Sequence, residues 1–460
     1  MGAGKSTLGL PAAERLGRPF IDLDRELEQD LGATIPELFE QRGEQEFRLH
    51  EARHALAALR LPDPAVIALG GGAVQTQAIR DELRERAFTV LLEVDVDTAW
   101  RRSAGADRPL ARDESDFRAL YERRRELYDL VADGRARDVD GIVLAAAGVQ
   151  VQGGALEQLG ALVPGTGDVA LVCDPHVAGI HGAAAQVALG PRLASAHEVL
   201  QGEAAKSARV AERLWAELRL DRDGTIVALG GGSTTDVAGF VAATYLRGVS
   251  WVAVPTTLVG QVDAAIGGKT AIDLPEGKNL VGAFHWPARA VVDPATLGTL
   301  AEEEWREGMA EVVKTGLLAG VPLWELPTVE LVRRCAAYKA AICLRDPYER
   351  GERTILNLGH TFAHALEAAA GYEGLTHGRA VALGLLAALR LSGRDTDAVG
   401  EVLAPERAHV DRERAWQALR RDKKARGGTQ RLVLLGDDGP VVETRPDAEV
   451  RAALDELIAQ

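Results

Sequence analysis

Two glycine triplets constrain the fold of this chain more strongly than any other feature of its sequence. Each follows a short apolar run, in "VIALGGGAV" at residues 66–74 and in "TIVALGGGSTTDVAG" at residues 225–239. An apolar run that ends in glycines is typical of a strand whose carboxyl end meets a ligand. "DVALVCDPHV" between the triplets predicts another strand, and "TIPELFEQRGEQEFRLHEARHALAALR" before the first predicts a helix. We therefore expect an α/β fold.

The length of the chain and the change of pattern along it predict several domains. At 460 residues the chain is too long for one compact core. After about residue 300 the strand patterns nearly vanish, and apolar periodicity predicts helices to the end, apart from a short hairpin in "QRLVLLGDDG". We expect the first boundary in the charged, glycine-rich stretch at about 132–168. We assign an α/β unit to residues 1–138, a second α/β domain to 139–298 and a helical domain to 299–460.

Charge and cysteine content exclude several classes of protein. A net charge of −15, with both signs interspersed, argues against a nucleic-acid-binding surface. The chain has no run of about 18 uncharged apolar residues, which is the length needed to span a bilayer. The N-terminus lacks the basic and apolar regions of a secretory leader. The three cysteines show no paired spacing typical of disulfides or of a thiolate metal site. We expect a cytoplasmic protein that binds neither nucleic acid nor membrane.

Lysine is rare in this chain, which makes each lysine informative. Only eight of the 53 basic residues are lysines, so arginine serves wherever a generic positive charge is enough. An ammonium differs from a guanidinium in size, in hydration and in its ability to shift its pKa. Most of the lysines lie inside recognisable motifs, and we interpret them as candidate site residues.

The N-terminus carries most of a phosphate-binding loop. In "GAGKST", Gly2 and Gly4 supply the turn, Lys5 reaches the β and γ phosphates, and Ser6 or Thr7 offers a hydroxyl to Mg²⁺. The amides of the following helix would face the anion. The complete pattern has one more glycine, two positions before the first residue, and a strand that leads into the loop. The match is partial, so the neighbouring motifs must decide its meaning.

Further motifs follow this loop. They are the two acids of "FIDLD", an arginine in "GEQEFR", the first glycine triplet, an arginine in "DRPLARD" and the basic helix "YERRRELY". Each charge alone is equally compatible with a solvated surface. Together with the loop, these motifs make residues 1–135 closely similar to shikimate kinase, a small P-loop kinase. The resemblance implies that the unit uses ATP with Mg²⁺ to phosphorylate the 3-hydroxyl of shikimate.

The resemblance to shikimate kinase also implies roles for individual side chains. Lys5 and Ser6 would hold the nucleotide phosphates and Mg²⁺, with Asp22 as the acid on the metal side. Asp24 would bind the shikimate hydroxyls and orient or deprotonate the one attacked. Arg108 would neutralise transition-state charge from a lid over ATP. The groups expected to hold the ring and carboxylate of shikimate are Arg48, Gly71, Gly72 and Arg124.

The incomplete loop leads to one more expectation. The strand that precedes a phosphate loop in this fold would be central and buried on both faces. Its loss would cost more than the roughly 5–15 kcal/mol that stabilises a typical domain. We expect either that Met1 is an internal methionine from a misplaced start, or that the kinase half is impaired while the rest of the chain works. A kinase-like unit without activity would be a binding or structural appendage.

The chain after the second triplet is dense in polar side chains. "STTDVAGFVAATYLRG" begins like a capped helix, whose amides suit a pyrophosphate. "VPTTLVGQVDAAIGGKTAIDLPEGKNLVGAFHWP" is rich in glycine, which is typical of loops that approach a ligand closely. Its two lysines indicate a phosphate or a carboxylate on that ligand. The alternative is a mobile surface loop with incidental charges. The polar residues concerned are Asp263, Lys269, Lys278, Asn279 and His285.

A candidate metal site lies in the helical third of the chain. "GMAEVVKTG" places Glu311 and Lys314 one helical turn apart, so both side chains face the same way. "RTILNLGHTFAHALEAAAGYEGLTHG" adds His360, His364 and His377. Two histidines and a carboxylate are a common catalytic zinc set that leaves one coordination position open. The i, i+4 spacing alone favours His360 and His364 as the histidine pair, and independent information is needed to choose.

These motifs make residues 142–460 similar to 3-dehydroquinate synthase. The resemblance implies an NAD-binding α/β domain, a helical metal-binding domain, a homodimer and a Zn²⁺ or Co²⁺ ion. It makes Glu311, His360 and His377 the ligands and places His364 beside the substrate phosphate as a proton-transfer partner. The implied substrate-binding residues are Lys269, Asn279, Lys314, Lys339, Arg353, Asn357 and Lys424, with Arg247 from a neighbouring subunit. The positions implied around NAD or the substrate are Glu203, Lys206, Gly231, Gly232, Asp236, Thr256, Thr257, Asp263 and Lys278.

The implied reaction converts 3-deoxy-arabino-heptulosonate 7-phosphate to 3-dehydroquinate and phosphate. It runs through transient oxidation by NAD⁺, elimination of phosphate, return of the hydride, ring opening and aldol closure, so NAD is regenerated in each turnover. Two related enzyme classes share the NAD and metal framework. Another sugar-phosphate cyclase would give a different product, and a metal-dependent glycerol dehydrogenase would accumulate NADH. The motifs "GGKTAID", "GKNLVGAFH" and "DKK" favour the synthase.

Overall fold

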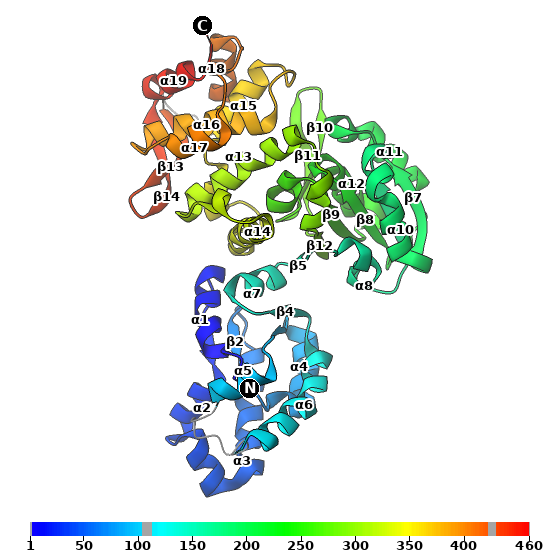
Figure 1. The fold of residues 1–460 in the computed structure, drawn as a ribbon, viewed down its shortest axis with the longest axis vertical. Helices are drawn as coiled ribbons and strands as arrows, with labels where there is room; N and C mark the ends of the chain where they lie inside the picture. The colour runs from blue at the N-terminus through cyan, green and yellow to red at the C-terminus, as the bar shows by residue number, and fades with distance from the viewer. Residues whose placement is uncertain (1, 104–112, 422–428, 460) are drawn as a thin grey trace. The chain divides into compact units, whose positions relative to one another are not determined.

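The computed structural model describes residues 2–103, 113–421 and 429–459. The chain forms two compact units, Met1–Gly148 and Val149–Gln460, which are drawn in Figure 1. Helix α7 (Val139–Ala146) packs against α1 (Lys5–Leu16) and against strand β4 (Gly134–Ala136) of the first unit. The first unit therefore includes α7, which the expected boundary at residues 138 and 139 would have assigned to the second domain.

The strands of the first unit form two separate parallel pairs. Strand β1 (Phe20–Asp22) pairs with β2 (Val66–Ala68), and β3 (Val90–Leu92) pairs with β4. Among residues 2–103 and 113–148, no strand joins one pair to the other. Strands β2 and β3 instead border a cavity of about 910 Å³, to which Ala3 and Lys5 of the phosphate loop also contribute. The sheet behind the phosphate loop is thus divided by a cavity.

Helices cover the two strand pairs of the first unit. The predicted helix at residues 34–60 is confirmed as α3 (Ile35–Leu59), which begins with a capping box between Thr34 and Glu37 and is kinked at Gly43, where φ is 80°. Ala55 of α3 and Ile79 of α4 (Gln77–Arg86) are completely buried in the core of this unit. The remaining helices are α2 (Leu23–Leu31), α5 (Val96–Ser103) and α6 (Glu114–Val131).

The second unit begins with a six-stranded parallel sheet, which confirms the predicted α/β architecture. Every residue of β6 and of β8 is buried, as expected for parallel strands covered on both faces. These two strands are the predicted ones at "DVALVCDPHV" and "TIVALGGG". In spatial order the strands are β5 (Val149–Val151), β12 (Arg289–Val292), β9 (Ser250–Pro255), β8 (Thr225–Gly230), β6 (Val169–Cys173) and β7 (Leu193–Glu198).

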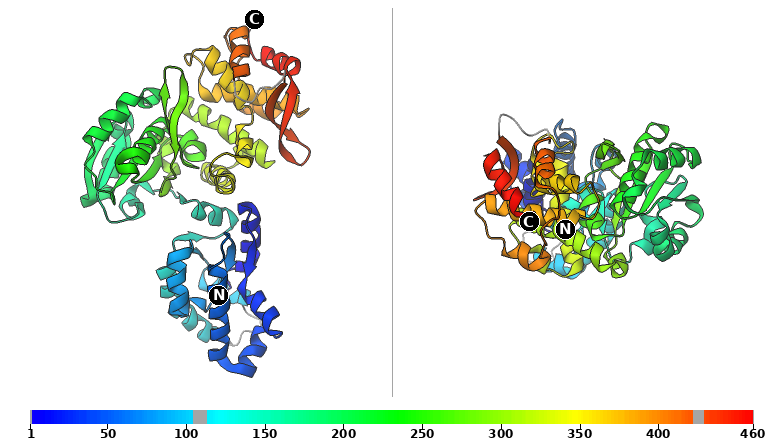
Figure 2. Two further views of the ribbon diagram at one scale, coloured as in Figure 1. Left: turned by 180° about the vertical axis from the view of Figure 1, so that it is seen from behind. Right: turned by 90° about the horizontal axis from the view of Figure 1, so that it is seen from above.

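Helix α12 (Gly232–Thr244) begins where β8 ends and packs against β8 and β9. An antiparallel hairpin of β10 (Lys269–Leu274) and β11 (Gly277–Phe284) also packs against α12. The glycine-rich stretch that the sequence suggested as a ligand loop therefore contains this hairpin. Figure 2 shows the sheet and its helices from behind and from above.

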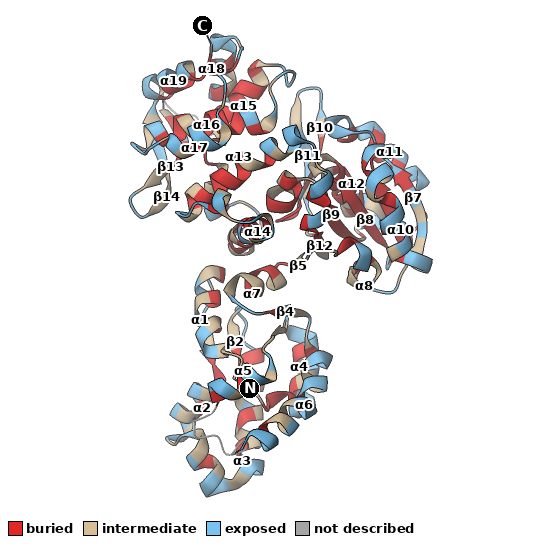
Figure 3. Cartoon of the chain, in the orientation of Figure 1, coloured by how far each residue is buried: buried red, intermediate tan, exposed pale blue. Residues whose placement is uncertain are grey.

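The second half of this unit is helical, as predicted. Phe362, Leu366, Leu383 and Val313 belong to one apolar core, and Figure 3 shows the buried faces of these helices in red. The predicted hairpin near residues 430–438 is confirmed as β13 (Thr429–Gly436) and β14 (Gly439–Pro446). None of the described helices is long and apolar enough to cross a membrane. The helices are α13 (Glu302–Ala319), α14 (Thr328–Arg345), α15 (His360–Ala369), α16 (His377–Leu391), α17 (Asp397–Leu403), α18 (Arg412–Arg421) and α19 (Asp447–Glu456).

Candidate active sites

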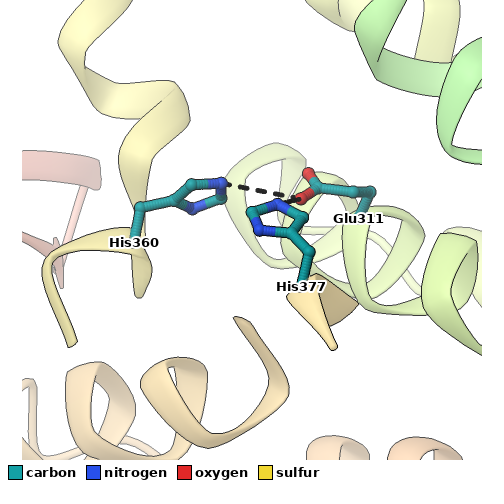
Figure 4. Close-up of side chains that lie close together, drawn as sticks. All are labelled: Glu311, His360 and His377. Atoms are coloured by element: carbon teal, nitrogen blue, oxygen red, sulfur yellow. Dashed lines mark ion pairs between the residues drawn. The ribbon is translucent and has the colours of Figure 1, made fainter. Parts of the chain in front are cut away.

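Three side chains from different helices converge in the second unit. Glu311 lies in α13, His360 is the first residue of α15 and His377 is the first residue of α16. One ligand atom of each side chain lies within 4.8 Å of those of the other two. Oε1 of Glu311 is 3.6 Å from Nε2 of His360 and 3.4 Å from Nε2 of His377 (Figure 4). The structure thus brings together the three residues expected to bind a metal ion.

The chemistry of this triad fits a divalent transition metal. Burial lowers the pKa of His360 to about 3, so its imidazole is neutral, the form that binds a metal. Burial alone would also lower the pKa of His377, but hydrogen bonds to Glu311 and Glu367 raise it to about 10. The His377 proton supplies positive charge beside Glu311, which is the charge that a metal ion would supply there. The second nitrogen of His360 also has a partner, the carbonyl of Leu358, at 3.2 Å, as metal ligands commonly do.

Two buried lysines connect this triad to the α/β domain. Lys314 forms an ion pair with Glu311, and its Nζ is 3.6 Å from Oδ1 of Asp263. Nζ of Lys339 in α14 is 2.8 Å from Oδ2 of Asp263 and donates to the carbonyl oxygen of Asp263 at 2.7 Å. Burial tends to raise the pKa of Asp263, but the positive charges of Lys339 and Lys314 have a larger combined effect. The pKa is therefore lower than that of an ordinary aspartate, and the carboxylate stays ionised. Asp263 therefore lies between two of the residues expected to bind substrate.

A second polar cluster gathers three other predicted substrate-binding residues. Lys269 begins β10, while Arg353 and Asn357 lie in a short 3-10 helix over residues 352–357. The guanidinium of Arg353 donates to the carbonyl oxygen of Pro347 at 3.0 Å, and Arg353 is buried. Lys269 and Asn357 both bind the carboxylate of Glu349. Sequence reasoning missed Glu349, although it stands four residues before Arg353 in the same motif-rich segment.

The predicted dinucleotide-binding glycines lie at the carboxyl edge of the sheet. Gly230 ends β8, and α12 begins at Gly232. A Cβ atom at Gly231 would lie 3.1 Å from Cγ2 of Thr257, so this turn is tightly packed. Thr256 and Thr257 directly follow the neighbouring parallel strand β9. Two strand ends and a helix N-terminus therefore meet at one point, the usual place for a pyrophosphate in such sheets.

An ionic cluster lies near this helix. Nζ of Lys206, which is buried, is 2.8 Å from Oδ2 of Asp236 and 3.5 Å from Oε1 of Glu203. Burial raises the pKa of Asp236 to about 6, although Lys206 opposes the shift. Lys206 also donates to the side chain of Asn279. Nζ of Lys278 is 3.9 Å from Oε1 of Glu203. The structure thus brings these five predicted residues together.

Other predicted residues of the second unit lie elsewhere or outside the described residues. His364 lies one turn after His360 in α15, with ring centroids 5.5 Å apart, and is not part of the metal-binding triad. Arg247 ends a short 3-10 helix with φ of 70°. Nε2 of His285 is 3.0 Å from the carbonyl oxygen of Val249, within the sheet region. Lys424 lies outside the described residues.

In the first unit, the phosphate loop leads into helix α1. Gly2 and Gly4 have φ of 62° and 83°, which favours glycine, and α1 begins at Lys5. Lys5, Ser6 and Thr7 thus form the first turn of α1, whose backbone amides can bind phosphate. Asp22 ends β1 and is buried. Arg108 lies outside the described residues.

The residues expected to bind shikimate lie around the end of β2. A Cβ atom at Gly72 would be 2.1 Å from Nη1 of Arg48, and one at Gly70 would be 2.9 Å from Oδ1 of Asp24. Tyr128, which sequence reasoning missed, donates to the carbonyl oxygen of Gly71 at 2.7 Å. The close approaches at Gly70 and Gly72 leave little room for a side chain at these two positions.

Two buried charged residues complete this group. Oε2 of Glu51 accepts from Nη1 of Arg48 at 2.5 Å, and only the i, i+3 spacing from Arg48 could have indicated Glu51 in the sequence. Arg124 in α6 is buried, which lowers its pKa, and Tyr128, Arg48 and Glu51 also act on it. The predicted shikimate-binding residues within the described part of the chain therefore form one group.

Comparison with protein families divides the chain in the same way. Residues 1–141 match the model for shikimate kinase. Residues 196–307 match the model for the N-terminal part of 3-dehydroquinate synthase, and residues 308–425 match the model for its C-terminal part.

Individual relatives agree with the family models. The chain is 39% identical over 341 residues to the 3-dehydroquinate synthase of Bordetella pertussis, covering 67% of this chain and 95% of that protein. It is 41% identical over 349 residues to that of Symbiobacterium thermophilum, covering 67% and 97%.

Two solved structures resemble the second part of the chain. A 2-deoxy-scyllo-inosose synthase with carbaglucose-6-phosphate, NAD⁺ and Co²⁺ is 25% identical with a TM-score of 0.60. The 2-epi-5-epi-valiolone synthase of Streptomyces hygroscopicus, with NAD⁺ and Zn²⁺, is 26% identical with a TM-score of 0.58. Each similarity covers 67% of this chain and 96% of the other.

Proposed function

This chain belongs to the 3-dehydroquinate synthase family and carries a shikimate kinase domain before the synthase part, and we propose that it catalyses two steps of the shikimate pathway. The synthase part converts 3-deoxy-arabino-heptulosonate 7-phosphate to 3-dehydroquinate and phosphate. The kinase part transfers a phosphoryl group from ATP to the 3-hydroxyl of shikimate. The observation that carries the first assignment is the convergence of Glu311, His360 and His377 beside the buried ammonium of Lys314.

The synthase needs a metal ion and a dinucleotide, and residues of this chain suit both. We propose that Glu311, His360 and His377 hold a Zn²⁺ or Co²⁺ ion, as their donor set favours. The turn at Gly231 and Gly232 would hold the pyrophosphate of NAD. When bound, NAD⁺ takes up and returns a hydride, and the metal ion polarises the hydroxyl that is oxidised. The NAD⁺ and metal ions in the two similar synthase structures support this choice.

The charged side chains around the metal site would bind and orient the substrate. The substrate carries a carboxylate, a phosphate and neighbouring hydroxyls, and cationic groups are spread over a matching region. Lys314 and Lys339 lie on one side, next to Asp263, and Lys269 with Arg353 and Asn357 lies on another. His364 follows the ligand His360 by one turn, and we assign to it the transfer of a proton at the substrate phosphate. Both lysines at Asp263 are buried, so their positions are fixed before the substrate binds.

The kinase part would use the first turn of α1 and the cluster around the end of β2. Lys5 and the amides of α1 would bind the phosphates of ATP, and Ser6 would bind Mg²⁺. Asp24 would orient the hydroxyl of shikimate that attacks. Arg48 is held by Glu51 at 2.5 Å and would bind the carboxylate of shikimate. Measuring shikimate-dependent formation of ADP tests this assignment, and no ADP above the background without shikimate would refute it.

Another sugar-phosphate cyclase is the alternative for the synthase part, since two such cyclases share its fold. The higher identity to 3-dehydroquinate synthases, 39–41% against 25–26%, favours the synthase. Incubation with 3-deoxy-arabino-heptulosonate 7-phosphate, NAD⁺ and Co²⁺, followed by identification of the cyclic product, tests this choice. A catalytically dead Glu311→Gln variant is the matched control, because it removes one ligand charge and retains the shape of the side chain.

A further inference from the structure

One acidic side chain of α13 binds the residues on both sides of His377. Glu307 lies in α13, and His377 is the first residue of α16. Oε2 of Glu307 accepts a hydrogen bond from the backbone N–H of Gly378 at 2.6 Å. Its Oε1 accepts one from the hydroxyl of Thr376 at 2.5 Å. A single carboxylate therefore holds the backbone of α16 at the point where His377 leaves it.

Glu307 supplies a cap that α16 does not supply itself. The side chain of Thr376, at the N-cap position, forms no capping hydrogen bond to the start of α16. The first backbone N–H groups of a helix have no partner within the helix, and a side-chain oxygen commonly accepts from one of them. Here that oxygen comes from α13, and its negative charge also suits a helix N-terminus. The first turn of α16 is thus fastened to α13.

The backbones of α13 and α16 approach closely at the same point. A Cβ atom at Gly378 would lie 2.6 Å from Cα of Glu307 and 2.7 Å from its carbonyl oxygen, so there is no room for a side chain at residue 378. Glu311 follows Glu307 by one helical turn, so both carboxylates lie on the same side of α13. One helix therefore provides Glu311 and also sets the place of His377 relative to it.

The loop before His377 gives it little other support. Residues 371–374, in the loop that joins α15 to α16, are exposed. His360 is held differently, because the residue before it is packed against α16. A Cβ atom at Gly359 would lie 2.8 Å from the backbone nitrogen of Leu385. The contacts of Glu307 are therefore the main anchor for the backbone of His377.

We propose that Glu307 is a positioning residue for the metal ligand His377. It acts on the backbone of α16, whereas Glu367 contacts the ring, with 3.4 Å between its Oε2 and Nδ1 of His377. Without Glu307 the start of α16 is free to move away from Glu311, and Nε2 of His377 no longer meets the ion at the same place. The inference rests on the proposed function, in which Glu311, His360 and His377 hold a metal ion.

Co²⁺ binding by the full chain, first freed of metal, tests the proposal. Competition with a chelator measures the affinity, and the ligand-field absorption of bound Co²⁺ reports the geometry of its ligands. We expect Glu307→Ala to weaken Co²⁺ binding about tenfold and to change the absorption band, as is typical when a group that orients a metal ligand is lost. An unchanged affinity with an unchanged band would overturn the proposal.

A conservative variant separates position from charge. Glu307→Gln keeps an oxygen for the N–H of Gly378, and its amide group can donate to the hydroxyl of Thr376. We expect it to bind Co²⁺ within about twofold of the unaltered protein, with the same absorption band. A loss as large as that of Glu307→Ala would show an effect of charge and would contradict positioning.

Three further variants separate positioning from a general loss of structure. Glu303→Ala removes an exposed carboxylate from the first turn of α13 and should leave Co²⁺ affinity within about twofold. Thr376→Val breaks only one of the two hydrogen bonds and should weaken Co²⁺ binding about threefold, which provides the test if Glu307→Ala does not fold. In a His377→Ala background, Glu307→Ala should cause no further loss, because it acts through His377. A loss in Glu303→Ala, none in Thr376→Val, or a further tenfold loss without His377 would contradict the proposal.

The Co²⁺ titration contains no substrate, so it separates this inference from the proposed function. Weaker Co²⁺ binding by Glu307→Ala in a protein that forms no 3-dehydroquinate would support the positioning role and refute the function. Formation of 3-dehydroquinate by a protein whose Glu307→Ala variant binds Co²⁺ normally would refute the positioning role alone.

Discussion

Replacing Lys314 by methionine should destabilise the second unit strongly when no metal is present. Lys314 is only 2% exposed and lies between the carboxylates of Glu311 and Asp263. Removing one partner of a buried ion pair typically costs about 3–5 kcal/mol, because a charge stays buried without its partner. Glu311 keeps His377 at 3.4 Å and Asp263 keeps Lys339 at 2.8 Å. We therefore expect the low end, about 3 kcal/mol, for Lys314→Met in the presence of EDTA.

Urea unfolding followed by tryptophan fluorescence measures this loss, since every tryptophan except Trp100 lies in the second unit. With saturating Zn²⁺ or Co²⁺ the loss should shrink to roughly 1 kcal/mol, because the metal ion compensates the charge of Glu311. Adding Glu311→Gln to Lys314→Met should recover part of the stability without metal. Arg306→Met, which breaks an exposed ion pair with Glu302 in the same helix α13, is the control and should cost less than about 1 kcal/mol. A loss below about 1 kcal/mol with EDTA, or an equal loss with and without metal, would refute the reasoning.

Three further predictions concern individual sites. His360→Ala should weaken Co²⁺ binding more than the roughly 10–100-fold that is typical for loss of a residue hydrogen-bonded to a metal ligand. His364→Ala should leave Co²⁺ binding nearly unchanged. Competition with a metal chelator measures both affinities, and equal effects would exclude the triad. Gly72→Ala should raise the KM for shikimate about tenfold at nearly constant thermal stability, because the new Cβ would displace Arg48; an unchanged KM in a steady-state kinase assay would contradict the clash. Lys5→Met should weaken ATP binding about tenfold in a nucleotide titration and leave the synthase rate unchanged, and a slower synthase would contradict the separation of the two sites.

The elements that the sequence predicted well carry a strong local pattern. β6 and β8 are continuous apolar runs because both faces of a parallel sheet are covered, and α3 begins with a capping box that the sequence shows. The β10–β11 hairpin was interpreted only as a ligand loop. Most residues of β11 are exposed, so no apolar alternation marks it, and its glycines resemble those of a loop.

Spacing alone predicted the sites where a motif is contiguous and not where helices meet; the resemblance to 3-dehydroquinate synthase supplied the triad of Glu311, His360 and His377, which the structure brings together. His360 and His364 share one helix, so their spacing suggested a pair, whereas the observed triad joins the first residues of α15 and α16 to the middle of α13. Packing of those helices, which no local pattern encodes, decides which histidine meets Glu311. Glu51 and Glu349 were missed for a related reason, because a carboxylate on a helix or a loop is usually a solvated charge. Helical spacing alone brings Glu51 to Arg48, and the folded chain buries this pair, whereas only the folded chain brings Glu349 to Lys269.

Product analysis of one reaction tests the central claim most directly. The full chain, loaded with Co²⁺ and NAD⁺, is given 3-deoxy-arabino-heptulosonate 7-phosphate, and phosphate, NADH and the cyclic product are measured together. We predict one 3-dehydroquinate for each phosphate released, with no net NADH and no turnover by Glu311→Gln. A different cyclic product, or NADH that accumulates with the substrate consumed, would contradict the assignment of this chain as a 3-dehydroquinate synthase.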